Sequence, residues 1–365
     1  MNNPSTLIKR NFGIDLLRII SMVYVLILHT LGIGGILKSL PPVSTQYKVF
    51  WFLEIWASCA VDIFVLISGF AGYSRKEKKP NYSKFILLWL EVVFYSAGIA
   101  IIYKYIHPSR VSAETIRNMF FPLTNEIYWF FCAYTGLFIM KPFLDAAVRQ
   151  LENKKLKHLM AIFFLAFSCF SMFTNPFRLV GGYSFVWFMI LYIFGASLKK
   201  LDVCGNISAK KAILGIICLS LVTWALKMLD FHVNFMNIHL STESLISYVS
   251  PIIVLSAILH VILFSKAEFS SLVNKIISFL STGTFSVYLI NTHPCLWNNE
   301  FEDRFIGWAS LPTAEILIRL LGFSCAFVLA SLLIDKIRQL LFKTLRLQPA
   351  LHRLQERINL TDRQF

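Results

Sequence analysis

The sequence predicts an all-α integral membrane protein with about ten transmembrane helices and both termini on the cytoplasmic side. Three observations support this fold class. The 365-residue chain is 56% hydrophobic and only 15% charged, whereas soluble domains carry about 25% charge. Apolar runs of membrane-spanning length recur along the chain. Short basic clusters separate many of these runs, a pattern typical of cytoplasmic loops.

Ten apolar segments are long enough, or nearly long enough, to cross a bilayer. They fall near residues 14–33, 50–73, 85–106, 128–148, 158–173, 184–198, 213–229, 245–264, 276–292 and 313–334. The first follows basic residues, as a signal peptide would. It contains Arg18 and no small-residue cleavage site follows, so we expect it to be retained as a helix. The fifth, sixth, seventh and ninth segments are short, and we expect neighbouring helices to bury them.

The distribution of Lys and Arg predicts the orientation of the helices. With a cytoplasmic N-terminus, 24 of the 35 basic residues fall in inside segments, six in outside segments and five within the proposed spans. The inside set includes Lys9, Lys78 and Lys79. Because cytoplasmic loops carry an excess of basic residues, this bias predicts cytoplasmic N- and C-termini and an even number of spans.

We expect one membrane domain over residues 1–335 and a basic, amphipathic cytoplasmic tail over residues 336–365. The longest outer loops, near 34–49, 107–127, 230–244 and 293–312, are too short to form a fused soluble domain. Leucines lie among Lys and Arg in the tail, as in helices that bind an anionic membrane surface. The alternative is an ordinary cluster of positive charges after the last span.

The net charge of +15 would suggest a nucleic-acid partner in a soluble protein. Here the basic residues lie between apolar runs and no RNA-binding motif is present, so we expect a lipid bilayer as a partner and no nucleic acid. The seven cysteines are scattered and form neither a CxxC pair nor a metal-ligand pattern. We therefore expect no disulfide framework and no metal site. The oligomeric state is left open by the sequence.

Arg18 and His29 lie in the first apolar segment, where ionisable side chains are costly and usually mark a partner or a site. Their spacing corresponds to about three turns of an α-helix, which places both side chains on one face, about 16 Å apart. The alternatives are an arginine that reaches the cytoplasmic headgroups and a histidine that bonds to a neighbouring helix. Their alignment favours a groove for a long ligand with an anionic end.

Two further polar features follow in the second segment. Asp62 lies near its middle, and we expect it to pair with His29, which would fix the tautomer of the imidazole. Ser68 and Gly69 allow two helix backbones to approach closely near the cytoplasmic side. Helix packing is the simpler explanation for the glycine.

Several of these residues belong to motifs that resemble the acyltransferase-3 family of membrane acyltransferases. Arg18 and His29 are similar to its R-x10-H signature, and residues 62–70 resemble its second-helix motif, an Asp before Phe-rich residues and Ser-Gly-Phe. Similar later segments lie at residues 128–137, 142–144, 183–195, 248–251 and 285–290. The likeness covers nearly the whole chain. One departure is Asn291, where many relatives have His; His293 follows two residues later.

The resemblance implies a reaction. It is the transfer of an acyl group, usually acetyl, from cytoplasmic acetyl-CoA or another acyl-CoA to a hydroxyl group of a cell-surface or lipid-linked polysaccharide. A short chain of this kind is most similar to a bacterial capsule or exopolysaccharide O-acetyltransferase. It would be a multi-pass protein of the inner (plasma) membrane with no permanently bound cofactor.

The resemblance also implies roles for individual residues. We expect Arg18, Arg75 and Ser68 to bind acyl-CoA, with the two guanidinium groups on its phosphates. His29, supported by Asp62, would act as general base toward the acceptor hydroxyl, or would carry the acyl group as an acetyl-histidine. Both routes are compatible with the sequence.

The acceptor and the developing oxyanion need further groups. The candidates are Tyr128, Trp129, Glu126 and Asn291, with Ser68 and Glu54 as additional ones. Tyr128 and Trp129 are equally typical of an interfacial aromatic belt, and Glu126 of a solvated loop.

Two other functional classes fit parts of the pattern. A transporter or flippase of an envelope precursor would also line a pathway with polar residues, but the sequence lacks an inverted repeat and matching Gly- or Pro-broken helices. A non-catalytic assembly subunit would use Arg18 and His29 as polar contacts between helices.

Overall fold

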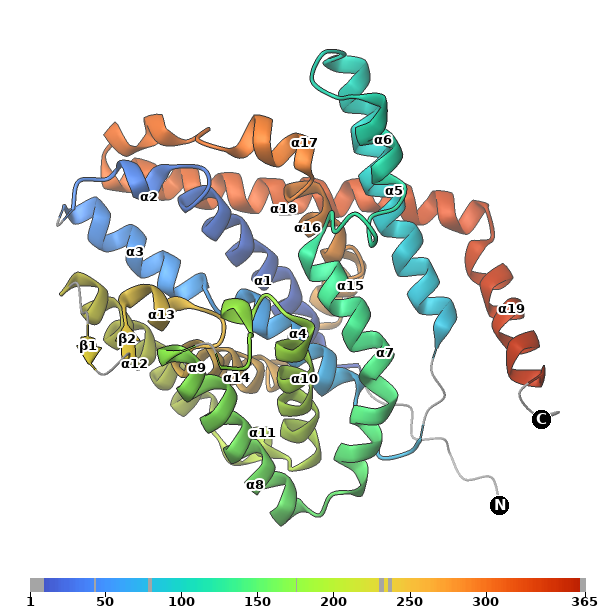
Figure 1. Ribbon diagram of the computed structural model, residues 1–365, viewed down its shortest axis with the longest axis horizontal. Coiled ribbons are helices and arrows are strands. Elements are labelled where there is room, and N and C mark those ends of the chain that lie inside the picture. Colours follow the sequence, from blue (N-terminus) through green and yellow to red (C-terminus); the bar gives the residue numbers. More distant parts are fainter. Residues whose placement is uncertain are drawn as a thin grey trace.

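The computed structural model describes residues 10–42, 44–77, 81–174, 176–229, 233–235 and 238–361. Within them the chain forms a bundle of helices that cross at varied angles, with one short hairpin at its edge (Figure 1). Lys9, Lys78 and Lys79, which the orientation prediction uses, lie outside the described residues, as do residues 362–365 of the tail.

The helices follow one another along the whole chain. The first half contains α1 (Phe12–Leu31), α2 (Ile36–Ser39), α3 (Thr45–Ala57), α4 (Ala60–Gly72), α5 (Tyr82–Ile106), α6 (Ala113–Met119), α7 (Trp129–Gln150), α8 (Asn153–Phe163), the π-helical segment η1 (Phe164–Cys169) and α9 (Phe170–Phe173). The second half contains the 3-10 turn η2 (Val180–Gly182), α10 (Phe185–Lys200), α11 (Val203–Asn206), α12 (Ala209–Met228), α13 (Thr242–Ile246), α14 (Pro251–Ser265), α15 (Ser271–Ser281), α16 (Thr284–Asn291), α17 (Pro294–Leu296), η3 (Trp297–Phe301), η4 (Ile306–Ser310), α18 (Thr313–Thr344) and α19 (Leu347–Thr361). Strands β1 (Val233–Phe235) and β2 (Ile238–Leu240) pair antiparallel.

Every predicted apolar segment coincides with one helix or with two or three consecutive helical elements. In the described part of the chain, eight helical segments are long and apolar enough to cross a membrane, and the pair α15–α16, bent by 40°, is a ninth candidate. The remaining segment is α10, whose 16 residues are shorter than a full span. The prediction of an all-α membrane protein is confirmed. The direction in which the helices cross stays a prediction.

Helix α10 is buried along most of its length because α4 packs directly against it. This contact depends on two glycines. A Cβ atom on Gly69 would lie 2.2 Å from the backbone oxygen of Tyr192, and one on Gly195 would lie 2.1 Å from that of Leu66. Glycine therefore lets the two backbones touch, as in other membrane helix pairs. The close approach predicted at Ser68 and Gly69 is confirmed.

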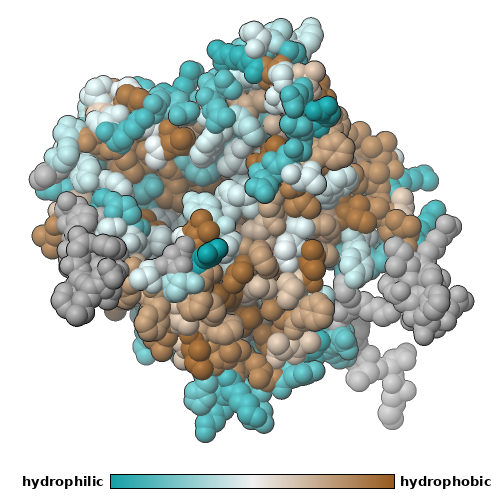
Figure 2. Space-filling view, in the orientation of Figure 1, coloured by the Kyte–Doolittle hydropathy of each residue, from teal (hydrophilic) through white to brown (hydrophobic). Residues whose placement is uncertain are grey.

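The short fifth and seventh segments differ from expectation, because they lie at the periphery. Only 11% of the apolar window in residues 153–173 is buried inside the structure, and 22% of that in α12. Figure 2 shows a broad apolar zone on this face, with hydrophilic residues at the lower tip, where α8 begins, and over α6. An apolar helix that faces lipid needs no protein cover, so short length does not imply burial.

The C-terminal helices connect the tail to the bundle. α18 continues through residue 335 without a break and ends at Thr344. α19 then runs back along α5 (Figure 1). There the backbone N–H of Ser83 donates a hydrogen bond to Gln355 Oε1 at 3.1 Å. Contact of the tail with lipid headgroups stays a prediction.

Candidate active site

A cavity of about 870 Å³ lies inside the bundle, and both Arg18 and His29 line it. Arg18 is in the first half of α1 and His29 is in its last turn. The 1.5 Å rise per residue separates them by about 16 Å along the helix axis. The spacing in the sequence predicts this shared face, and the structure confirms that both side chains reach one cavity.

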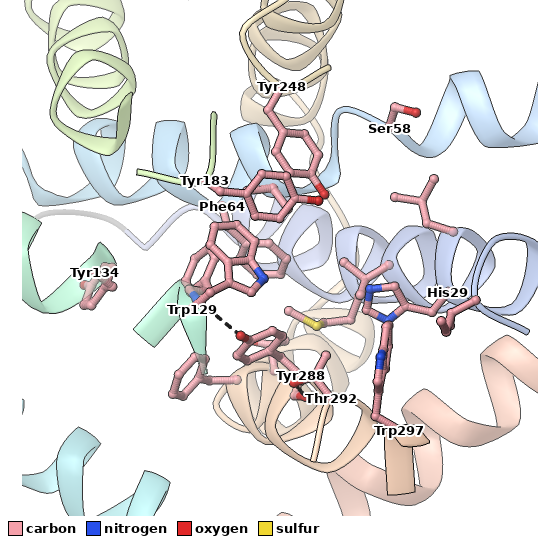
Figure 3. A pocket seen from close by; sticks show the side chains of 18 of the residues that line it. His29, Ser58, Phe64, Trp129, Tyr134, Tyr183, Tyr248, Tyr288, Thr292 and Trp297 are labelled. Atoms are coloured by element: carbon pink, nitrogen blue, oxygen red, sulfur yellow. Dashed lines mark hydrogen bonds between the residues drawn. The ribbon is translucent and has the colours of Figure 1, made fainter. Parts of the chain in front are cut away.

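His29 is held by a residue from the far end of the chain. Its Nδ1 is hydrogen-bonded to Oδ1 of Asn291, the last residue of α16. An amide oxygen only accepts, so Nδ1 donates the hydrogen atom, and in the neutral ring Nε2 then has the lone pair. The ring of Trp297 meets the imidazole edge to face, with 4.7 Å between centroids (Figure 3). This arrangement fixes the orientation of the imidazole at the cavity wall.

The expected pair between Asp62 and His29 is wrong. Asp62 lies in the first turn of α4, is fully buried, and accepts a hydrogen bond from Trp187 Nε1 of α10 at 3.2 Å. The tight packing of α4 on α10 directs the carboxylate toward α10. The partner of His29 is Asn291 because α16 packs against α1, a contact that adjacency in the sequence does not reveal.

The neighbouring His293 has a structural role. Its Nε2 donates to the backbone oxygen of Ser96 at 2.9 Å, and its Nδ1 accepts from the backbone N–H of Cys295 at 3.1 Å. Burial lowers the pKa of His293 to about 4, although the hydrogen bond to Ser96 acts in the opposite direction. A neutral histidine with both nitrogens occupied cannot act as an acid or a base. The departure at Asn291 is therefore not compensated by His293.

Arg18 lies at the other end of the cavity. Its Nη1 contacts Asp15 Oδ1 at 2.5 Å, one turn earlier on α1, and the other carboxylate oxygen of Asp15 accepts from Arg10 Nε at 2.5 Å. Asp15 therefore orients the guanidinium while two cations share its charge. The side chain of Arg18 retains 30% of its accessible surface, so it is available to a ligand.

A second, smaller cavity of about 360 Å³ adjoins the first at Arg18, Ser68 and Tyr134. Lys84 from the first turn of α5 and Lys141 from α7 also line it. We call this space the cationic vestibule. Among the described residues that line it, none is acidic. The vestibule lies where α1 begins, α4 ends and α5 begins, on the side that the basic loops predict to be cytoplasmic.

Arg75 lines neither cavity and is exposed in the loop after α4. The predicted pair of arginines is thus not assembled: Arg18 is in the vestibule and Arg75 is outside it. Lys84 and Lys141, rather than Arg75, lie with Arg18 in the vestibule. The sequence gives one sign of this, because a lysine within an apolar segment, such as Lys141, is rare and usually marks a site. In the structure its Nζ lies 5.5 Å from the centroid of the Tyr192 ring, at the vestibule wall.

The other predicted residues separate into two groups. Trp129, the first residue of α7, lines the main cavity. Tyr128 points elsewhere and donates a hydrogen bond to the backbone oxygen of Leu289 at 3.2 Å, which joins α7 to α16. Glu126 is exposed in the preceding loop. Neither Tyr128 nor Glu126 is among the residues that line the two cavities.

Sequence reasoning names Trp129 and Glu54 as acceptor candidates but gives no role to the tyrosines of the cavity wall opposite His29. Trp129, Tyr183 and Tyr248 pack together there, with 4.5 Å between the ring centroids of Trp129 and Tyr183 and 5.1 Å between those of the two tyrosines. The hydroxyl groups of Tyr183 and Tyr248 lie close together and point into the space between this wall and His29 (Figure 3). Glu54 and Ser58 from the end of α3 also line the cavity. We call Trp129, Tyr183 and Tyr248 the aromatic wall.

A metal centre has no visible ligand set in the described ranges, where no group of three or more His, Cys, Asp or Glu side chains is placed to hold an ion. The cavity instead offers an imidazole, an arginine at the opposite end, and hydroxyl and aromatic groups between them. This arrangement suits proton transfer to or from a long, partly anionic substrate.

Comparison with known proteins adds one finding. A family model described as an acyltransferase domain matches residues 11–335, which include the cavity and the vestibule. No curated protein and no solved structure matches the chain. Since the match spans nearly the whole membrane region, the chain belongs to the acyltransferase-3 family of membrane acyltransferases.

Proposed function

We propose that the protein transfers an acyl group, most simply acetyl, from cytoplasmic acyl-CoA to a hydroxyl group of a cell-surface or lipid-linked polysaccharide at the bacterial inner membrane. The observation that carries this proposal is that Arg18, in the first half of α1, and His29, in its last turn, line one cavity. A donor with an anionic head and a reactive thioester at the end of a flexible arm fits this arrangement.

The cationic vestibule supports an acyl-CoA donor. Arg18, Lys84 and Lys141 surround a small space that lacks acidic lining residues. Coenzyme A carries its phosphates at one end, and Arg and Lys bind phosphate oxygens through charge-assisted hydrogen bonds. With the phosphates in the vestibule, the arm passes Ser68 and Tyr134 into the main cavity and brings the thioester toward His29.

In this proposal His29 acts as the general base toward the acceptor hydroxyl group. Nε2 removes the proton from the acceptor hydroxyl, whose oxygen attacks the thioester carbonyl carbon. A C–O bond forms, the C–S bond breaks, and the departing thiolate of coenzyme A takes the proton back from the imidazolium. Asn291 holds Nδ1 throughout and so keeps Nε2 directed to the cavity. All atoms balance without a further reactant.

The oxyanion of the tetrahedral intermediate needs a hydrogen-bond donor. Tyr288 lines the cavity and accepts the backbone N–H of Phe130 at 3.3 Å, which fixes its hydroxyl oxygen while leaving an O–H to be donated. Ser68, by contrast, donates to the backbone oxygen of Phe64 in its own helix. Tyr288 is therefore the better placed donor.

An acyl-histidine route uses the same geometry, with Nε2 as nucleophile. Kinetics separates the two routes. Direct transfer requires both substrates to be bound together and gives sequential kinetics, whereas an acyl-enzyme gives ping-pong kinetics and exchange of label between acetyl-CoA and free CoA without acceptor.

The test in cells is His29→Gln, with protein level and O-acetyl content of the envelope measured together. Normal protein with lost O-acetylation supports the proposal. Retained O-acetylation at normal protein level would remove His29 from the mechanism. Asn298→Ala is a matched control, because Asn298 lines the same cavity without a chemical role in this scheme.

A further inference from the structure

We infer that Glu54 and the aromatic wall form a subsite for one uncharged sugar ring of the acceptor. This inference rests on the proposed function, because it specifies the substrate whose hydroxyl group faces His29. It assigns the two ends of the cavity to two ligands: the anionic donor to the vestibule and a neutral glycosyl unit to the space between Glu54, the aromatic wall and His29.

Glu54 has a carboxyl oxygen without a hydrogen-bond partner in the described part of the chain. It lies in the last turn of α3 and lines the main cavity. Its Oε2 is inaccessible to solvent and has no hydrogen-bond partner among the described residues. A buried polar atom without a partner costs free energy, so native structures almost always satisfy such atoms. A ligand hydroxyl group in the cavity would supply the missing donor.

The aromatic wall offers a packing surface for a sugar ring. The rings of Trp129 and Tyr248 are close to parallel, at 16°, with 6.4 Å between centroids, and Tyr183 packs against both. The C–H groups on a face of a sugar ring pack on aromatic surfaces, while its hydroxyl groups need polar partners around the edge. The hydroxyls of Tyr183 and Tyr248 (Figure 3) supply such partners, and the side chain of Glu54 lines the same cavity.

The charge distribution selects a neutral sugar. Arg18 is the one Lys or Arg side chain that lines the main cavity in the described part of the chain, and it lies at the vestibule end. A carboxylate or phosphate on the sugar would lose its hydration at the Glu54 end of the cavity with no cation to balance its charge, which is costly in a partly dehydrated site. In the vestibule, by contrast, Arg18, Lys84 and Lys141 would balance the charge of the anionic donor.

The test uses the purified full-length protein in detergent and saturation-transfer NMR. The probes are the methyl glycosides of glucose, galactose, mannose, rhamnose and N-acetylglucosamine, with methyl glucuronide as the anionic counterpart of the glucoside. We compare wild type with Glu54→Gln and Trp129→Leu. Glu114→Gln is the matched control, because that glutamate is 72% exposed and pairs with Arg117 on the surface helix α6. Thermal unfolding verifies that each variant is folded.

We expect at least one neutral glycoside to bind wild type and the control, and to bind both site variants about 10-fold more weakly, since Glu54→Gln alters a hydrogen-bonding group and Trp129→Leu removes an aromatic packing surface. We also expect methyl glucuronide to give no binding signal with wild type, because no Lys or Arg among the described residues lines this end of the cavity. Binding of methyl glucuronide as tight as that of methyl glucoside would contradict a subsite for a neutral sugar. Binding that is unchanged in both variants, or no binding of any glycoside to wild type, would overturn the subsite.

Different results would exclude the subsite and the proposed function. CoA release from acetyl-CoA in the presence of membrane glycans, combined with an absence of glycoside binding, would remove the subsite and leave the acyltransferase standing. Glycoside binding that depends on Glu54, combined with no acyl transfer by wild type, would retain the subsite and remove the proposed reaction.

Discussion

His29 Nδ1 is hydrogen-bonded to Asn291 Oδ1, which joins the end of α1 to the end of α16 and leaves Nε2 at the cavity wall. The partner is neutral, so it sets the tautomer and the orientation of the ring without adding a negative charge. This contact differs from the carboxylate partner that the sequence suggests, and it leads to the first prediction.

Asn291→Ala should lower kcat about 10- to 100-fold, the usual effect of removing the group that orients a functional histidine. The KM for acyl-CoA should not change, because Asn291 lies away from the vestibule. Steady-state kinetics on purified protein measures both. Asn291→Asp keeps an acceptor oxygen for Nδ1 and should recover part of kcat. An unchanged kcat in Asn291→Ala would show that His29 needs no orienting partner.

Lys84→Gln and Lys141→Gln should each raise the KM for acyl-CoA about 10-fold, since a charge-assisted hydrogen bond to a phosphate is lost. Arg75→Gln should leave it unchanged, because Arg75 is outside both cavities. The comparison shows whether the phosphates of acyl-CoA are bound by Arg18 with Arg75, as the sequence suggests, or by Arg18 with Lys84 and Lys141. A KM raised in Arg75→Gln alone would contradict phosphate binding by the two lysines.

Arg18→Gln should raise the KM for acyl-CoA more than either lysine variant does, since Arg18 lines both cavities. The substitution also leaves Asp15 with Arg10 as its remaining cationic partner. The double variant Asp15→Asn/Arg18→Gln removes this side effect. A double variant with a normal KM would contradict a role for Arg18 in donor binding.

Gly69→Ala and Gly195→Ala should destabilise the protein by about 1–3 kcal/mol or more, because each new Cβ meets a backbone oxygen on the facing helix. Thermal unfolding in detergent measures the effect. Gly98→Ala is the matched control: it is also helical, and a Cβ there meets nothing within 4 Å. Equal unfolding temperatures for all three variants would contradict the tight packing of α4 on α10.

Much of the fold can be predicted from the sequence because lipid imposes simple requirements. A span must be apolar and about 20 residues long, and its backbone hydrogen bonds must be satisfied internally. These rules locate all ten segments, including α10, although they do not tell which short helix is buried. α10 is central and α12 is peripheral, because burial depends on which neighbours pack against a helix.

The candidate site is predictable only where one helix carries it. The shared face of Arg18 and His29 follows from helix geometry alone. The contact of His29 with Asn291 spans 262 residues of sequence. Lys84 and Lys141 come near Arg18 only because α1, α5 and α7 border the same cavity. Such long-range contacts depend on helix packing, which periodicity does not encode.

The central claim is that two adjoining cavities bring an anionic donor from the vestibule to the imidazole of His29. The most direct measurement is a structure of the full-length protein bound to a thioether analogue of acetyl-CoA that cannot transfer its acyl group. We predict phosphate oxygens at Arg18, Lys84 and Lys141 and the carbonyl carbon of the analogue beside His29 Nε2. Phosphates bound elsewhere, or a carbonyl carbon separated from His29 by protein, would contradict the account.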